Sequence, residues 1–284
     1  MAITLEGGCR VSEMREGQPF TAGTLRIWNR IGRATGAQAI SLRVMEFAPG
    51  LSTGLRNGDY DEILYVLDWE RGQAGSPAEQ PDWGARPVRL SEHSERTPGD
   101  EALGQISING HSHELSPDTG IYIRPGETLA VNNPGPGPII MISSQCPDPD
   151  CEPQFVDALT SPGSDSPVPL SLVRLSERPA QPTADRWYRV LVDAEIGSTQ
   201  VTQFVGSIPP GRAPDHFHHY EEVLFILRGE GRMWAGETGT PIAPGSCIYL
   251  PKGQVHCVEN TGKDQLRLLG VFYAAGSPSV RYDV

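Results

Sequence analysis

Three histidines and a glutamate near the C-terminal end have types and spacing that could do chemistry: His216, His218, Glu222 and His256. Alternate side chains of an extended strand share one face, so His216 and His218 can point to the same side. Glu222 has the same parity and opens an apolar run, and a neighbouring strand could bring His256 opposite. Three imidazoles and one carboxylate suit a divalent ion of Fe, Mn, Ni, Cu, Co or Zn. Four protein ligands leave one or two positions open, as in catalytic metal sites.

The residues around His216 resemble the first motif of the cupin family. Gly211 precedes the His216-Phe-His218 triplet, three residues separate His218 from Glu222, and six more separate Glu222 from Gly229. Four residues lie between Gly211 and His216, where the family has five. The resemblance implies a small antiparallel barrel with the metal ion inside it.

The residues around His256 resemble the second cupin motif throughout. Gly245 is followed after five residues by Pro251 and Gly253, then by His256, and after three more residues by Asn260. The resemblance implies that His216, His218, Glu222 and His256 bind one metal ion. It also implies that the glycines, the proline and the asparagine shape the turns.

Other side chains near these motifs are candidates for moving protons. Tyr220 has the parity to approach the four residues or to pack beside them, and Tyr249, Glu259 and Arg212 lie in or next to the motifs. Tyr220, Tyr249 and Arg212 are therefore the candidate catalytic residues.

The elements that position these residues are predicted to be short strands. Apolar runs such as EILYVLDW, GIYIRPG, EEVLFILRG and CIYLPKG are rich in β-branched and aromatic residues and bounded by turn residues. The 32 glycines and 26 prolines supply many turns, and no long segment has helical periodicity. The fold class is therefore predicted to be all-β.

The two halves of the chain follow the same plan. EILYVLDW matches EEVLFILRG in order, and GIYIRPG matches CIYLPKG, which favours two antiparallel jelly-roll barrels. We expect a first barrel in residues 1–146, a linker in 147–169 and a second barrel in 170–284. Residues 70–104 have no counterpart and are predicted to be an insertion.

The first half keeps the frame without the ligands, as in the degenerate half of a bicupin. Aligning Glu62 with Glu222 puts Arg56 and Gly58 at the places of His216 and His218, and Ala130 at that of His256. We expect metal in the second barrel alone. His111 and His113 lie between Gly and Pro and are predicted to belong to a hairpin tip.

Composition narrows the classes of partner. The net charge of −12 disfavours binding to nucleic acid or to anionic membranes, and no apolar run is long enough to span a bilayer. Five cysteines without a complete zinc set, and a start without a signal-peptide pattern, indicate a reduced cytoplasmic protein. Cupin edges often associate, so we expect a homodimer.

The resemblance implies an enzyme that acts on a small molecule, and three classes of activity remain open. A dioxygenase using Fe(II) on a diketone, phenolic or enol substrate is the first interpretation, because the ligands would lie in an apolar barrel. The alternative is a redox-neutral isomerase, lyase or hydrolase acting on a sugar, ureide or keto acid. The third class is a binding protein without catalysis.

Overall fold

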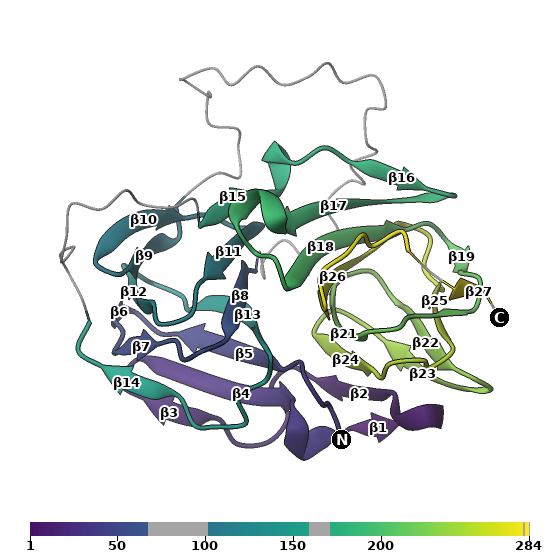
Figure 1. Ribbon diagram of the computed structural model, residues 1–284, viewed down its shortest axis with the longest axis horizontal. Helices are drawn as coiled ribbons and strands as arrows, with labels where there is room; N and C mark the ends of the chain where they lie inside the picture. Colours follow the sequence, from purple (N-terminus) through teal and green to yellow (C-terminus); the bar gives the residue numbers. More distant parts are fainter. Residues whose placement is uncertain (68–101, 159–170, 281, 284) are drawn as a thin grey trace.

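The computed structural model describes residues 1–67, 102–158, 171–280 and the backbone of 282–283. In this part of the chain, antiparallel strands form four sheets stacked as two domains of two sheets each (Figure 1). Each domain has an inner sheet that faces the other domain and an outer sheet that closes its own core. This arrangement confirms the predicted all-β fold of two jelly-roll domains.

The first domain lies on the left in Figure 1. Its inner sheet has the order β15-β11-β8-β13-β5-β4-β3, with bounds β3 Phe20–Ala22, β4 Leu25–Ile31, β5 Leu42–Phe47, β8 Asp61–Val66, β11 Thr119–Ile123, β13 Ile139–Cys146 and β15 Leu172–Arg174. Its outer sheet has the order β10-β9-β12-β7-β14, with β6 also on β12, and its bounds are β6 Gly50–Leu51, β7 Gly54–Arg56, β9 Gly104–Ile108, β10 His111–Leu115, β12 Thr128–Asn133 and β14 Gln154–Val156.

The second domain repeats this plan. Its inner sheet has the order β1-β2-β24-β21-β26-β18-β17-β16, with bounds β1 Ile3–Thr4, β2 Arg10–Glu13, β16 Gln181–Thr183, β17 Arg186–Val192, β18 Val201–Ile208, β21 Glu221–Arg228, β24 Ser246–Leu250 and β26 Leu266–Tyr273. Its outer sheet has the order β23-β22-β25-β20-β27, with β19 also on β25, and its bounds are β19 Gly211–Arg212, β20 His216–Phe217, β22 Gly231–Ala235, β23 Thr238–Ile242, β25 His256–Asn260 and β27 Tyr282–Asp283.

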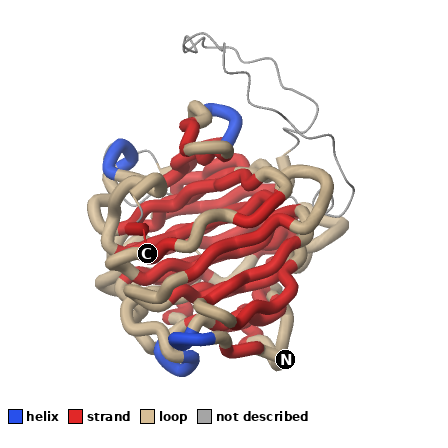
Figure 2. Tube along the Cα trace, turned by 90° about the vertical axis from the view of Figure 1, so that its right-hand side faces the viewer, coloured by secondary structure: helices blue, strands red, loops and turns tan. Residues whose placement is uncertain are grey.

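Helical structure in the described residues is limited to short 3₁₀ turns at the rims of the sheets (Figure 2). The four turns are η1 Glu6–Gly8, η2 Arg33–Thr35, η3 Leu175–Glu177 and η4 Ala194–Ile196. None of the described helices has the length and apolar character needed to cross a bilayer.

The inner sheets are buried on both faces, which explains their almost continuous apolar runs. In β21, Leu224 and Ile226 point into the core of the second domain, whereas Val223 and Phe225 belong to a core shared by both domains. In the first domain, Ile63 and Tyr65 of β8 face the same shared core. Strand parity therefore decides whether a side chain lies inside a domain or between the two domains.

Two strands pair with the sheet of the other half of the chain. β2 comes before every strand of the first domain, yet it pairs with β24 of the second. β15 follows residues 159–170 and pairs with β11 of the first domain. The two domains therefore exchange a strand at each side of their contact.

The predicted boundaries stay predictions, although the sheets add detail to them. β14 lies inside the predicted linker 147–169 and pairs with β7 of the first domain. The predicted insertion 70–104 lies outside the described residues except for its last part, which includes Gly104 at the start of β9.

Candidate metal centre

The structure brings His216, His218 and His256 together at one end of the second domain. His216 lies on β20 opposite His256 on β25, so the two residues are cross-strand partners. Their ring centroids are 4.5 Å apart, and His218 lies 4.9 Å from His216 and 5.2 Å from His256. One ligand nitrogen from each of the three rings lies within 4.8 Å of the others.

Backbone carbonyls select the tautomer of two of these histidines. The Nδ1 atom of His216 lies 3.0 Å from the carbonyl oxygen of Pro214, and that of His256 lies 2.8 Å from the carbonyl oxygen of Gln254. Because a carbonyl only accepts hydrogen bonds, Nδ1 is the donor in each neutral ring. The lone pair then lies on Nε2, as a metal ligand requires.

Glu222 supplies a carboxylate at the same place. It is at the start of β21, and its Oε2 atom lies 3.6 Å from Nε2 of His218. Only 5% of Glu222 is exposed. The four residues predicted from the motifs therefore converge, and their donor set suits a divalent metal ion of borderline softness.

Burial shifts the pKa values of three of the clustered residues toward their neutral forms. Burial raises the pKa of Glu222 to about 8. The pKa of His218 falls to about 3, first through burial and then through the neighbouring His256 and His216. Burial and His216 lower the pKa of His256 to about 4. At neutral pH Glu222 is therefore mostly protonated, and His218 and His256 are neutral.

A cavity of about 130 Å³ opens beside the cluster. The lining divides into apolar side chains from both sheets and a few polar groups. The apolar part includes Phe204, Ile208, Leu224, Val258 and Leu268, and the polar part includes Thr183, Arg186, Tyr188, Ser207 and Ser279.

Sequence reasoning did not single out Arg186, Tyr188 or Phe204, which lie on β17 and β18 far from the two motifs. The repeat between the two halves of the chain could have pointed to these residues, because Tyr188 and Phe204 lie on β17 and β18, which are equivalent to β4 and β5.

Tyr220 packs beside the cluster. Its ring stacks on His218 at 4.7 Å with an interplanar angle of 9°, and on Phe272 at 4.5 Å with an angle of 19°. Tyr220 therefore fixes the plane of the His218 ring, which corresponds to the packing alternative considered for this residue.

The structure does not bring Tyr249 or Arg212 into the cavity. Tyr249 points from β24 into the contact between the domains, where its hydroxyl donates to Glu221. Arg212 contacts the Cys257 thiol and Asp215, and its guanidinium lies over Trp234. Both side chains leave their strands on the face opposite to the metal cluster.

Glu259 also lies away from the cavity, where it accepts a hydrogen bond from the indole of Trp234. His111 and His113 lie on β10 of the first domain, directly after the turn at Asn109 and Gly110. All five cysteines are free thiols, and Cys151 alone among them is exposed.

The first domain has apolar residues where the second has the histidine pair. Asn133 and Asn260 bond in the same way to the carbonyls around their turns, so these two residues are equivalent. Counting from them along β12 and β25 places Leu129 at the position of His256, and the partner of Leu129 is Leu55. The expected alignment with Arg56 and Ala130 is therefore off by one residue.

The shift has a local cause. The turn glycines Gly126 and Gly253 have φ values of 78° and 77° and occupy equivalent places. The alignment had matched Pro125 with Pro251, one residue out of register. Leu55 and Leu129 carry no ligand atom, so the expectation of metal in the second domain alone is unchanged.

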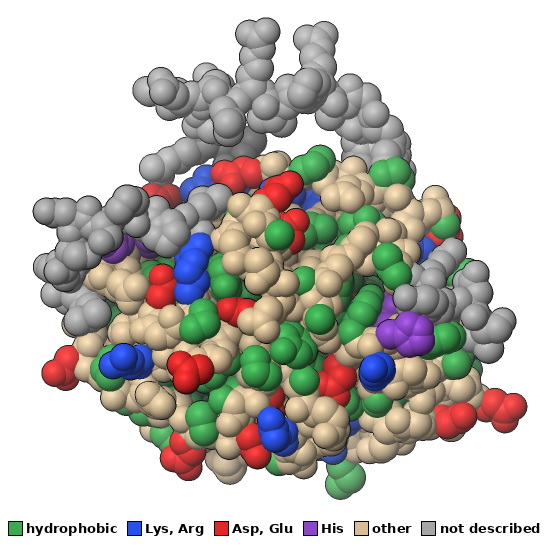
Figure 3. Space-filling view, viewed as in Figure 1, with side chains coloured by type: hydrophobic (Ala, Val, Ile, Leu, Met, Phe, Trp, Pro, Cys, Tyr) green, Lys and Arg blue, Asp and Glu red, His purple; other side chains and the backbone are tan. Residues whose placement is uncertain are grey.

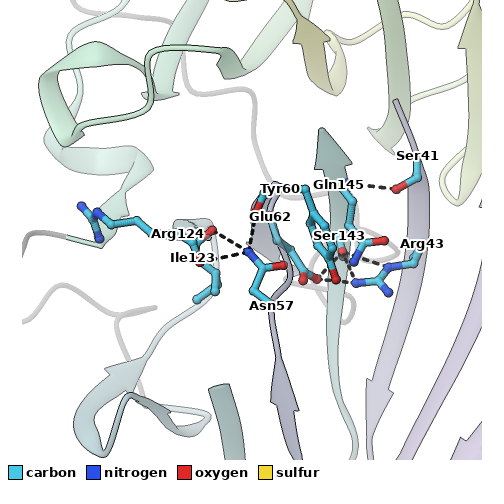
Figure 4. A network of polar contacts seen from close by, with 9 residues as sticks. All are labelled: Ser41, Arg43, Asn57, Tyr60, Glu62, Ile123, Arg124, Ser143 and Gln145. Carbon is cyan, nitrogen blue, oxygen red and sulfur yellow. Dashed lines mark hydrogen bonds and ion pairs between the residues drawn. The ribbon is translucent and has the colours of Figure 1, made fainter. Parts of the chain in front are cut away.

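Glu62 keeps the place of Glu222 but has a different partner. The guanidinium of Arg43, on β5, pairs with Glu62 and also donates to the hydroxyl of Ser143 at 3.1 Å, and Ser143 donates to Glu62 at 2.7 Å (Figure 4). The amide oxygen of Gln145, turned toward this group, accepts from Tyr60 and from Arg43. A cation of the protein itself therefore balances the carboxylate.

The equivalent positions in the second domain are apolar and mostly aromatic. The strand registers put Arg43, Ser143 and Gln145 at the places of Phe204, Gly270 and Phe272. A Cβ atom on Gly270 would lie 2.3 Å from the ring of Phe204, so the glycine makes room for that ring. One domain thus surrounds its buried glutamate with a polar network, and the other with rings and imidazoles.

Residues 204–272 match a family model described as Cupin domain. This segment contains both motifs and all four clustered residues. Residues 204–272 of the second domain therefore form a cupin domain with both motifs intact.

Curated relatives match about a quarter of the chain. Auxin-binding protein 1 of Arabidopsis thaliana is 32% identical over 83 residues, which are 26% of this chain and 42% of the relative. The oxalate-binding protein of Thermotoga maritima is 36% identical over 66 residues, which are 22% of this chain and 54% of the relative. The chain thus spans about half the length of the curated relatives that it matches.

Solved structures share the fold over nearly the whole bicupin. A variant of oxalate decarboxylase from Bacillus subtilis aligns with a TM-score of 0.67 at 13% identity, over 94% of this chain and 77% of the other. A putative glyoxylate-induced protein of Pseudomonas aeruginosa aligns with a TM-score of 0.67 at 15% identity, over 99% and 94%. At such identities the likeness shows the fold.

We expect the replacement His216→Ala or His256→Ala to abolish binding of divalent metal, because each removes one of the four clustered donors. His111→Ala should leave the metal content unchanged, because His111 lies in the other domain. Elemental analysis of the three purified variants checks this. Retained metal in the first two, or lost metal in the third, would contradict the site.

Metal affinity should rise with pH and level off above about pH 8. A metal ion has to displace the proton of Glu222, whose pKa is about 8 without metal. Below that value the affinity should gain about tenfold per pH unit, since one proton is released. His218 and His256 are already neutral in this window. Chelator competition with Mn²⁺ between pH 6 and pH 8 measures the slope, and a flat profile would contradict this assignment.

Arg43→Met should lower the free energy of unfolding by about 3–5 kcal/mol, because it leaves the Glu62 carboxylate buried without its partner. The double replacement Arg43→Met with Glu62→Met should recover most of that loss, because no charge remains to be compensated. Urea unfolding of the two variants and the wild-type protein provides the comparison. Equal losses in both variants would show that the ion pair is not the cause.

Proposed function

We propose that the second domain is the active site of an enzyme that uses one divalent metal ion on His216, His218, Glu222 and His256. The observation that carries this proposal is the convergence of three imidazoles, of which those of His218 and His256 are buried, with the buried carboxyl of Glu222 beside a cavity. A divalent ion bound there would polarise an oxygen of the substrate, and an ion with accessible redox states could also pass electrons.

A bound metal ion would satisfy the polar atoms of the cluster better than their contacts with one another do. The Glu222 carboxyl is fully buried, and Nδ1 of His218 is a buried polar atom without a hydrogen-bond partner among the described groups. Such groups destabilise a fold unless binding offsets the loss. With three neutral imidazoles, one carboxylate and a divalent ion, the site would carry a charge of about +1. It would therefore favour a small anion.

The size of the cavity limits the substrate. A cavity of about 150 Å³ holds one molecule of benzene, and the cavity here measures about 130 Å³. This favours a compact keto acid, dicarboxylate or enol over the phenolic substrates that the sequence also allowed.

We favour redox-neutral chemistry at carbon, in the sense of a lyase or isomerase. Support comes from the bicupin fold shared with oxalate decarboxylase and from the oxalate-binding relative. The Bacillus subtilis decarboxylase has Mn(II) centres, and the donor set here suits manganese as well as iron. The polar groups of the cavity lining, Arg186, Tyr188 and Ser207, would orient a carboxylate as it binds.

Dioxygenase activity with Fe(II), the first interpretation from sequence, remains the second candidate. The apolar wall formed by Phe204, Leu224, Val258 and Leu268 favours it, because such a wall accommodates dioxygen and protects reactive species from water. The ring of Tyr188, another residue of the cavity lining, packs edge-on against Phe204 of this wall, with 6.4 Å between the ring centroids.

Figure 3 shows charges of both signs scattered over one face of the molecule, without an extended basic area. This mixture agrees with a small-molecule substrate as the partner. The cytoplasmic location and the homodimer stay predictions.

The test is turnover of small acids by protein reconstituted separately with Mn²⁺ and Fe²⁺, with and without dioxygen. Anaerobic release of CO₂ or isomerised product by the Mn²⁺ form, abolished by Glu222→Gln, is the expected result. Stoichiometric oxygen consumption by the Fe²⁺ form would instead establish the dioxygenase. A wild-type protein that takes up neither metal would overturn the proposal.

A further inference from the structure

Glu221 directly precedes the clustered Glu222 and points the other way, out of the second domain. It is only 7% exposed. Its Oε1 atom accepts the backbone N–H of Gln38 at 2.8 Å, and its Oε2 atom accepts that of Ala39 at 2.6 Å. Both donors belong to the first domain, so consecutive N–H groups of one domain hold the two oxygens of a carboxylate in the other.

A tyrosine of the second domain completes this contact. The Tyr249 hydroxyl donates to Oε1 of Glu221 at 2.5 Å, and it also lies 3.4 Å from the carbonyl oxygen of Gly36. Glu221 therefore receives three short hydrogen bonds in a buried place, where charge-assisted bonds to a carboxylate are strong. The contact consists of Glu221, Tyr249 and the segment 36–39, and we call it the Glu221 clamp.

The first domain has a looser copy of the same device. Asp61 precedes Glu62, accepts the hydroxyl of Tyr122 at 2.7 Å, and receives only a long side-chain bond of 3.4 Å from Gln200 of the second domain. Among the described residues, no pair of backbone N–H groups donates to the Asp61 carboxylate. The tight version of the contact thus lies beside the metal-binding glutamate, and the loose version beside the glutamate that pairs with Arg43.

We infer that Glu221 is a positioning residue, through which the first domain fixes the place of the Glu222 carboxylate at the metal ion. The two side chains leave adjacent residues of β21 on opposite faces, so a displacement of one moves the backbone that carries the other. The clamp holds the first residue of that strand, where the sheet ladder is least constrained. This inference rests on the proposed metal site.

The clamp also gives the first domain, which lacks the metal ligands, a role at the metal site. Its segment 36–39 follows η2 and is held in turn by the bond from the Asp148 N–H to the carbonyl oxygen of Ala39 at 3.0 Å. The first domain thereby presents two fixed donors to the second. Residues that orient a metal ligand typically change metal affinity by about 10–100-fold when they are replaced.

The decisive variant is Glu221→Gln in the full chain, with Asp61→Asn as the matched control. Glutamine keeps the size but puts an NH₂ group against one of the two backbone N–H donors, so one bond becomes a repulsion. We expect about tenfold weaker Mn²⁺ binding and an altered fine structure in the Mn²⁺ electron paramagnetic resonance spectrum. Asp61→Asn should leave the affinity and the spectrum at their wild-type values.

A second pair of variants tests the inference even if Glu221→Gln does not fold. Tyr249→Phe removes one bond to Glu221 and should weaken Mn²⁺ binding a few-fold in the same direction, whereas Tyr122→Phe should not. Urea unfolding of the metal-free forms is measured alongside. A loss of stability without a change in the spectrum would mean that the role is merely structural.

The outcomes separate the two proposals. A wild-type affinity and spectrum in Glu221→Gln would overturn this inference and leave the proposed metal site standing. An equal change in Asp61→Asn would also overturn it, because general loosening of the domains would then be the cause. A wild-type protein that binds no Mn²⁺ would overturn the proposed function, and the inference with it.

Discussion

A glutamate buried at the same place in each domain is the constraint on which the rest of the structure depends. A carboxylate removed from water must be protonated, paired with a cation or bound to a metal. The first domain pairs Glu62 with Arg43, and the second surrounds Glu222 with imidazoles that cannot neutralise it. The residues around each glutamate follow from that choice: hydroxyl and amide groups around the guanidinium, rings and a glycine around the imidazoles.

The four clustered residues could be proposed from the sequence, because each motif is local and its spacing resembles that of the cupin family. Alternation along a strand puts His216 and His218 on one face, and the turn glycines fix where His256 begins its strand. The all-β fold in two domains follows from short apolar runs between turn residues, and its inner sheets explain why several of those runs show no alternation. These predictions needed no knowledge of how distant strands meet.

Other features could not be predicted, since they depend on register and on long-range pairing. Part of the cavity lining, including Tyr188 and Phe204, comes from β17 and β18, which carry no motif. The outward direction of Tyr249 was not predictable either, because strand parity does not tell which face is the interior. The alignment of the first half failed by one residue at Leu55 and Leu129, since matching the prolines of two turns does not fix the register of the strands beside them. Glu221, one residue out of phase with the clustered Glu222, connects the two domains.

The exchange of β2 and β15 has a consequence for how the chain acquires its fold. β2 emerges from the ribosome before any strand of the first domain, yet its partner β24 is made only near the end of synthesis. Until then β2 has no partner, and an unpaired strand is a site for wrong pairing with other chains. A second domain expressed alone would in turn expose the edge of β24 that β2 covers.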